Sequence, residues 1–236
     1  MRICVLASGS KGNSTYVETN NHKILFDMGT NVKYIKERLE ELSVSLNDID
    51  TIIISHIHSD HIGALENYIK KYSGNVYMTM GMIGELDSNN PISKYEHLVI
   101  FDDDIYLDNI RIEVIKTSHD TKDSKGYILY EENNSVVYLF ESNHDVEMLL
   151  NGKYPPWLKD RVVGPYGHLS NKDASIYLAK LIGEDTKKVV LLHLSHENNT
   201  EEKAMDTIKS IFLEYGVDFD NISCAKQNEK SEIIEL

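Results

Sequence analysis

The segment IIISHIHSDHIG, residues 52–63, most restricts what this chain can fold into. Three consecutive isoleucines are typical of a strand that is buried on both faces. Three histidines and an aspartate follow within six positions, namely His56, His58, Asp60 and His61. Ligand-type side chains therefore gather where a buried strand is expected to end, which is a usual place for functional sites in α/β proteins.

These four side chains offer imidazole and carboxylate donors, which suit zinc, iron or manganese. No cysteine lies near them in the sequence, and this argues against a closed structural zinc site. The alternative is a solvated, histidine-rich turn, which the density of ligand-type residues makes the weaker interpretation. If His56 and His58 lie on the strand, their side chains point to the same face.

One loop cannot close a catalytic coordination shell, so further ligands are expected from distant strand ends. His119 ends the strand signal in IEVIKTSHD, and His193 ends that in VVLLHLS. Either histidine alone could equally be a core or surface residue. Beside the cluster at 56–61, metal binding is the favoured interpretation of both.

The remaining pattern predicts a layered α/β protein, because short strand signals alternate with helical ones. No Gly/Ser or Pro tract separates two halves, so one domain over 1–236 is expected. Helices are predicted at 32–42, 61–72, 171–183 and 200–216. Strands are predicted at 2–8, 15–19, 23–27, 51–55, 75–78, 98–101, 110–116, 125–131, 135–140, 187–195 and 221–226, with 15–19 and 23–27 forming a hairpin.

The charge balance is acidic, with 24 Lys and Arg against 38 Asp and Glu and a formal net charge of −14. The composition therefore does not indicate a broad basic surface for nucleic acid. An enzyme that binds a few phosphate groups is still compatible with this charge. Cys4 and Cys224 lie far apart without a CxxC motif, which favours a reducing compartment. The N-terminal apolar run is too short for a signal peptide, so a cytoplasmic protein without membrane spans is expected.

Five stretches of the chain together resemble a known family. An HxHxDH pattern directly after an apolar strand is the signature of the metallo-β-lactamase superfamily. The other stretches are similar to a small bacterial branch of it, whose members are encoded beside a two-component system that regulates cell-wall metabolism. These stretches are LASGSKGNSTYVE (6–18), ESNHDVEML (141–149), GHLSN (167–171) and HLSHENN (193–199).

The resemblance implies a four-layered αββα sandwich, with metals at one edge between the two sheets. It also implies two divalent metal ions, Zn or Mn and less readily Fe, and a phosphodiesterase or DNA exonuclease activity. Carried over position by position, the ligands of the first metal are His56, His58 and His119. Those of the second are Asp60, His61 and His193.

One departure from the family concerns the aspartate that bridges the two metals. In the superfamily it ends a strand between the third and the last ligand histidine. Here SVVYLFESNHD runs from one strand straight into the next motif, so the aspartate-bearing loop and a helix are missing near residue 140. Glu141 and Asp145 are the possible substitutes, and the second metal depends on one of them.

The ligand types imply a metal-bound hydroxide that attacks phosphorus in line. Asp60 would orient this nucleophile as well as bind metal. His168 is the candidate for the proton donor to the leaving group or for a phosphate clamp. Lys11, Asn13 and His144 are expected to contact the substrate, Lys11 as a point charge for phosphate.

Structural alternatives accompany several of these assignments. Ser170 and Asp173 resemble a helix capping box that His168 merely precedes. The loop GSKGNS could be a bare turn. The stretch YPPWLKDR, with Trp157, is expected to cap the core or make a dimer contact, and base stacking is the less favoured use. FDDDIYLD (101–108) is expected to be a solvated turn.

Three functions are therefore compared. The favoured one is a metal-dependent phosphodiesterase or DNA exonuclease that acts on nucleic acid or a small phosphodiester. The second is a metallo-hydrolase of a lactone, thioester or other small carboxyl substrate on the same fold. The third is a non-catalytic member that binds a partner. The fold is compatible with all three functions, so the geometry of the site has to distinguish them.

Overall fold

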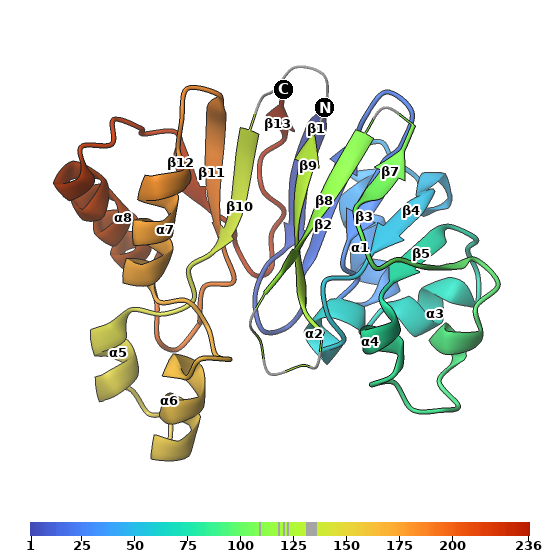
Figure 1. Cartoon of the computed structure of the whole chain (residues 1–236), viewed down its shortest axis with the longest axis horizontal. Helices are drawn as coiled ribbons and strands as arrows, with labels where there is room; N and C mark the ends of the chain where they lie inside the picture. Colours follow the sequence, from blue (N-terminus) through green and yellow to red (C-terminus); the bar gives the residue numbers. More distant parts are fainter. Residues whose placement is uncertain (109, 118, 120, 122, 131–135) are drawn as a thin grey trace. The chain divides into compact units, whose positions relative to one another are not determined.

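The structure is a computed structural model that describes residues 1–108, 110–117, 119, 121, 123–130 and 136–236 (Figure 1). The chain divides into two compact units. Unit 1 comprises Met1–Ala7, Lys11–Asn133 and Asn228–Leu236, and unit 2 comprises Ser8–Ser10 and Asn134–Gln227. The single domain over 1–236 stays a prediction.

Unit 1 contains a seven-stranded sheet in the order β13-β1-β2-β3-β4-β5-β6. The predicted hairpin is confirmed, since β2 and β3 pair antiparallel. From β3 to β6 the neighbours are parallel, and all three residues of β4 are buried, as its isoleucines predict. The strands are β1 Arg2–Ala7, β2 Ser14–Glu18, β3 Lys23–Phe26, β4 Thr51–Ile53, β5 Asn75–Met78, β6 Leu98–Ile100 and β13 Ile234–Glu235.

A second, antiparallel sheet of unit 1 consists of β7 Ile105–Leu107, β8 Ile110–Lys116 and β9 Lys125–Tyr130. β7 lies inside the stretch that was predicted to be a solvated turn, so that prediction is wrong for its second half. Ile105 and Leu107 are buried while Tyr106 between them is exposed. This two-residue alternation is that of a strand with one buried face.

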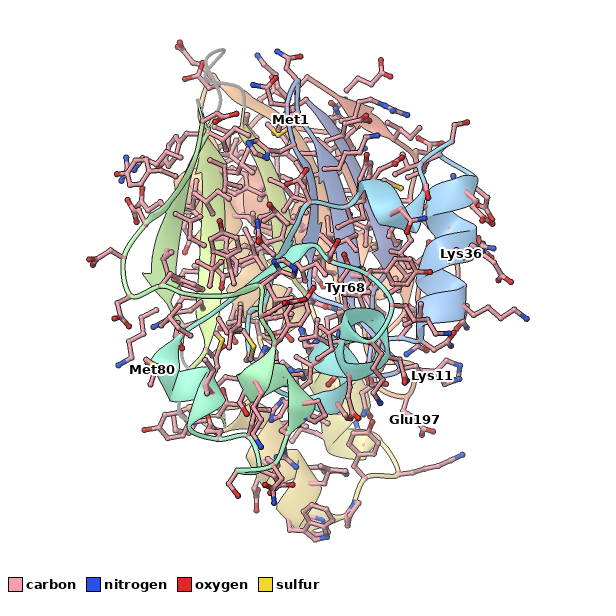
Figure 2. All side chains as sticks on the ribbon, turned by 90° about the vertical axis from the view of Figure 1, so that its right-hand side faces the viewer. Met1, Lys11, Lys36, Tyr68, Met80 and Glu197 are labelled. Atoms are coloured by element: carbon pink, nitrogen blue, oxygen red, sulfur yellow. The ribbon has the colours of Figure 1, made fainter. Side chains whose placement is uncertain are left out.

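The helices of unit 1 follow the apolar spacing only in part. α1, Val32–Glu40, matches the prediction and buries Ile35 and Leu39, while Lys36 is on its exposed face (Figure 2). The predicted helix at 61–72 is divided into α2 Ser59–Ile62 and α3 Leu65–Ile69. The break arises because the Ala64 N–H donates to the carbonyl of Met28, 2.8 Å away, instead of continuing the helix.

Three short helical segments of unit 1 were not predicted. They are the α-helix α4, Met80–Ile83, and the 3-10 helices η1 Leu46–Asp48 and η2 Pro91–Lys94. Each is four residues or fewer, which is too short to give a helical period. They close the unit around a core in which Tyr68 is fully buried (Figure 2).

Unit 2 contains a parallel sheet in the order β10-β11-β12, with β10 Val136–Glu141, β11 Thr186–Leu192 and β12 Ile222–Cys224. The helices α7 Asn171–Leu181 and α8 Glu201–Tyr215 share its core. α8 begins after Thr200, which caps its N-terminus, and ends at Gly216 in the left-handed conformation (φ 68°), both as predicted.

The helices α5 Val146–Asn151 and α6 Pro156–Val163 were not predicted. Both lie at one end of unit 2 (Figure 1). The strand β10 ends at Glu141 and α5 begins at Val146, so the described residues hold no additional helix between these two elements. Among the described residues, no helix has the length and apolarity needed to cross a membrane.

Candidate metal centre and its surroundings

Three predicted ligands of the first metal lie together in unit 1. One ring nitrogen from each of His56, His58 and His119 lies within 4.8 Å of the other two. Their ring centroids are 4.6 to 4.9 Å apart. His56 and His119 are 63 positions apart in the sequence. They converge because His56 follows the end of β4 and His119 follows the end of β8.

The first two of these histidines are carried by a loop. β4 ends at Ile53, two residues before the predicted end of this strand, so His56 and His58 do not share a strand face. The loop is anchored at its start, since the Lys125 N–H donates to the carbonyl of Ser55 at 2.9 Å. The Tyr127 hydroxyl donates to the carbonyl of Ile54 at 2.7 Å. The strand β9 therefore fixes the loop in position.

His56 has the properties of a metal ligand. Its side chain is 7% exposed, and its Nε2 is buried without a hydrogen-bond partner among the described residues. Burial, followed by the neighbouring imidazoles of His61, His119 and His58, lowers the pKa of His56 to about 2. The ring is therefore neutral, as metal binding requires, and its orphaned nitrogen fits a divalent metal ion.

His61 is held by a carboxylate that the sequence did not reveal. Its Nδ1 lies 2.7 Å from Oδ2 of Asp27, and its Nε2 lies 3.5 Å from Oδ2 of Asp60. Burial alone would lower the pKa of His61, but the carboxylates of Asp27 and Asp60 raise it to about 10. A cation at Nε2 therefore has to displace a proton.

Asp27 also anchors the histidine loop from the other side. It adopts a left-handed backbone conformation (φ 61°) directly after β3. Its carboxylate accepts hydrogen bonds from the Ser55 N–H at 2.8 Å and from the Ser55 hydroxyl at 2.7 Å. Such carboxylates fix the ring orientation of a ligand histidine. An aspartate at the end of a strand signal was the only available clue.

Asn13, predicted to contact substrate, lies against Asp60. Its Nδ2 is 3.0 Å from Oδ2 of Asp60, and its N–H donates to the Asp60 carbonyl at 2.7 Å. Gly29 permits this approach, because an added Cβ there would lie 1.5 Å from the Asp60 carbonyl oxygen. Lys11 is exposed, two residues before Asn13 (Figure 2).

Unit 2 holds a second cluster, formed by Glu141, His168 and His193. Oε1 of Glu141 lies 2.8 Å from Nδ1 of His168 and 2.9 Å from Nδ1 of His193. Oε2 accepts a hydrogen bond from the Leu169 N–H at 3.0 Å. Burial would raise the pKa of Glu141, but the hydrogen bonds from both histidines outweigh it and hold this pKa well below its usual range. Glu141 is therefore a carboxylate that orients two rings at once.

The backbone of His193 is strained. It is left-handed (φ 56°), which is uncommon for a residue other than glycine and typically marks a functional position. Its N–H donates to the hydroxyl of the buried Ser8 at 2.8 Å, and its carbonyl accepts from Asn143 at 2.9 Å. These two bonds hold the strained conformation, and Ser8 was not singled out from the sequence.

Three further positions singled out from the sequence, His144, Asp145 and Ser170, lie in unit 2, and two of them cap helices. His144 is 2% exposed, and its Nδ1 is buried without a hydrogen-bond partner in the part of the chain that the structure describes. Ser170 caps α7 as expected, with its hydroxyl accepting from the Asp173 N–H at 3.1 Å. Asp145 caps α5. Of the two possible substitutes for the bridging aspartate, Glu141 lies within hydrogen-bond distance of His168 and His193, whereas the Asp145 carboxylate accepts from the Met148 N–H at 2.9 Å.

Comparison with known proteins agrees with this geometry. Residues 7–121 match the model of the metallo-β-lactamase superfamily. Exodeoxyribonuclease WalJ of Streptococcus pneumoniae serotype 2 (strain D39 / NCTC 7466) is 34% identical over 247 residues, covering 92% of this chain and 92% of WalJ. The chain belongs to the metallo-β-lactamase superfamily, in the branch of WalJ. As a member it is a metal-dependent hydrolase that binds divalent metal.

Two further relatives support the family and the fold. Exodeoxyribonuclease YycJ of Bacillus anthracis is 32% identical over 240 residues, with 92% of this chain and 90% of YycJ covered. The crystal structure of the metallo-β-lactamase fold protein YhfI from Bacillus subtilis superposes with a TM-score of 0.63 at 14% identity. It covers 98% of this chain and 99% of YhfI. The predicted metallo-β-lactamase fold is confirmed.

The comparison with WalJ also bears on the missing segment. The 247 aligned positions exceed the 236 residues of this metallo-β-lactamase family member. WalJ therefore has residues without a counterpart here. That the shortening lies near residue 140 stays a prediction, which agrees with the position of Glu141 as the last residue of β10.

Proposed function

We propose that this chain is a metal-dependent exodeoxyribonuclease that hydrolyses phosphodiester bonds of DNA. The observation that carries the proposal is the convergence of His56, His58 and His119, with the buried Nε2 of His56 lacking a partner among the described residues. The relatives WalJ and YycJ supply the substrate class by their names. The free thiols of Cys4 and Cys224 support a reducing, cytoplasmic place of action.

The proposed cofactors are two divalent ions, Zn or Mn and less readily Fe. His56, His58 and His119 would hold the first, and the imidazole donors favour these metals over Mg or Ca. Asp60, His61 and His193 remain the proposed ligands of the second. When bound, such ions lower the pKa of a coordinated water to about 7 and neutralise charge on the phosphoryl oxygens.

The residues of unit 1 prepare the attacking side of the reaction. Asp27 orients His61, and Asn13 holds the Asp60 carboxylate through its amide. Asp60 is thus held by the Asn13 amide, and it can orient a nucleophilic water. Lys11 is the exposed point charge proposed to receive a phosphate group of the substrate.

The residues of unit 2 serve the leaving group. The Nδ1 of His168 faces Glu141, so its Nε2 is the atom that can deliver a proton to the departing alkoxide oxygen. Glu141 is a positioning residue, because its carboxylate orients the ring through the contact with Nδ1. His144 is too deeply buried for direct contact in this conformation, and its proposed role in substrate binding rests on the resemblance alone.

The proposal predicts degradation of DNA from its ends. With Mn²⁺, the protein should shorten a linearised plasmid that carries end labels. It should leave the same plasmid intact when that plasmid is a covalently closed circle. A chelator should stop the reaction. Electrophoresis of both substrates over time makes the measurement, and a variant with His97 replaced by alanine serves as control. Cleavage of the circle at the same rate would contradict exonuclease action, and no cleavage of either would contradict the proposed substrate.

A further inference from the structure

Exposed apolar and aromatic side chains are concentrated in one part of unit 2. Residues 146–166 include five of the large exposed hydrophobic side chains, namely Val146, Leu150, Trp157, Val163 and Tyr166. Trp157 is 65% exposed, so it does not cap the core, and the dimer contact expected as the other use stays a prediction. Exposed aromatic residues gathered in this way mark an interaction site rather than ordinary surface.

The helix α6 arranges part of this surface. Pro155 and Pro156 start the helix, and Trp157 follows in its first turn. Arg161 lies one turn further on, so its exposed side chain is on the same face as Trp157. Val162 is buried and fixes the opposite face. An aromatic ring and a guanidinium are thus presented side by side on a rigid element.

The charge of this part of the chain differs from that of the whole. Residues 151–167 contain the basic residues Lys153, Lys159 and Arg161 but only one acidic residue, Asp160. The stretch therefore has a local net charge of +2, while the whole chain has −14. Residues 146–166 as a whole, with Glu147 included, have a net charge of +1, so this segment is more favourable for a polyanion than the acidic remainder of the chain.

A tight turn connects this surface to the proposed proton donor. The His168 N–H donates to the carbonyl of Val162 at 2.9 Å, and the Gly167 N–H donates to that of Gly164 at 2.9 Å. Glycine is required at 167, because a Cβ there would lie 2.1 Å from the Val162 oxygen. Tyr166, 62% exposed, projects from this turn two residues before His168. The surface is thus anchored to a residue of the proposed chemistry.

We propose that Trp157, Arg161 and Tyr166 form a binding surface for the single-stranded end of the DNA substrate. The aromatic rings stack on bases without regard to sequence, and Arg161 and Lys153 contact the phosphates. The substrate class of this α6 surface, formed by Trp157, Arg161 and Tyr166, rests on the proposed function. The proposal is that the segment 153–166 binds single-stranded DNA rather than duplex.

The test compares Trp157→Ala with the conservative Trp157→Phe. Stacking of one base on an aromatic side chain is worth about tenfold in affinity. Trp157→Ala should therefore bind a fluorescein-labelled oligo(dT) about tenfold more weakly, as measured by anisotropy, while Trp157→Phe stays within about threefold of wild type. Hydrolysis of bis(p-nitrophenyl) phosphate, which offers no base to stack, should be unchanged in both.

A second readout uses the wild-type protein. Trp157 is the only tryptophan, so intrinsic fluorescence reports on this position alone. Quenching by unlabelled oligo(dT) is expected. Unchanged affinity of Trp157→Ala, or a change in its sedimentation without loss of affinity, would overturn the proposal, the latter in favour of a dimer contact. Quenching and weakened binding in a protein that cleaves no DNA would uphold the surface and refute the nuclease function.

Discussion

Replacement of His58 by alanine is expected to lower hydrolysis by about a thousandfold or more and to remove at least one bound metal ion. The metal contributes several kcal/mol of transition-state stabilisation, and each 1.4 kcal/mol corresponds to about tenfold in rate. His58 precedes α2, but its side chain makes no capping hydrogen bond, so the variant should still fold. Bis(p-nitrophenyl) phosphate hydrolysis and elemental analysis make the measurement.

Two matched variants make this result interpretable. His97→Ala removes a histidine that is 40% exposed and paired only weakly with Glu96, so activity and metal content should stay at wild-type values. Asp27→Asn keeps the shape of the side chain and tolerates the left-handed backbone, but removes the charge that orients His61. The hydrolytic activity of Asp27→Asn should be about 10- to 100-fold lower than that of the wild type. Wild-type activity in His58→Ala would show that the histidine cluster is not the reaction centre.

Replacement of His168 by alanine is expected to separate two kinds of substrate. A general acid contributes about 10²- to 10⁴-fold when the leaving group is a poor one. The alkoxide that leaves from DNA needs a proton, whereas p-nitrophenolate departs without one. DNA hydrolysis by His168→Ala should therefore fall by about a thousandfold. Hydrolysis of bis(p-nitrophenyl) phosphate should fall by less than about tenfold.

The Glu141→Gln variant tests how His168 is controlled. The amide keeps the side-chain shape but no longer provides a charged acceptor for both ring N–H groups. Glu141→Gln should show the same dependence on the leaving group as His168→Ala. Its rate of DNA hydrolysis should fall by less than that of His168→Ala. An equal loss on both substrates in His168→Ala would instead assign this histidine to substrate binding or to structure.

Local patterns predicted those parts of the site that depend on neighbours in sequence. The cluster at 56–61 follows from its own spacing, and His119 was indicated because it ends a strand signal. Asp27, Ser8 and Glu141 were missed as partners of His61, His193 and His168, because hydrogen bonds between distant strand ends leave no periodicity in the sequence. Their positions became evident only from distances.

The errors in the predicted fold have the same origin. The helix predicted at 61–72 is interrupted because the Ala64 N–H finds the Met28 carbonyl, a tertiary contact that overrides helical spacing. β7 was missed because only two buried residues alternate in it, beside three aspartates that resemble a turn. α6 was not predicted, although Pro156 stands at its first position, where proline is favoured.

The central claim, that bound metal performs the hydrolysis, is tested most directly by counting metal ions and activity in one preparation. Elemental analysis before and after chelation, with bis(p-nitrophenyl) phosphate hydrolysis at each stage, gives both quantities. Two divalent ions per chain, loss of activity on their removal and recovery on addition of Mn²⁺ or Zn²⁺ are predicted. Full activity in metal-free protein, or two bound ions with no hydrolysis, would contradict the account.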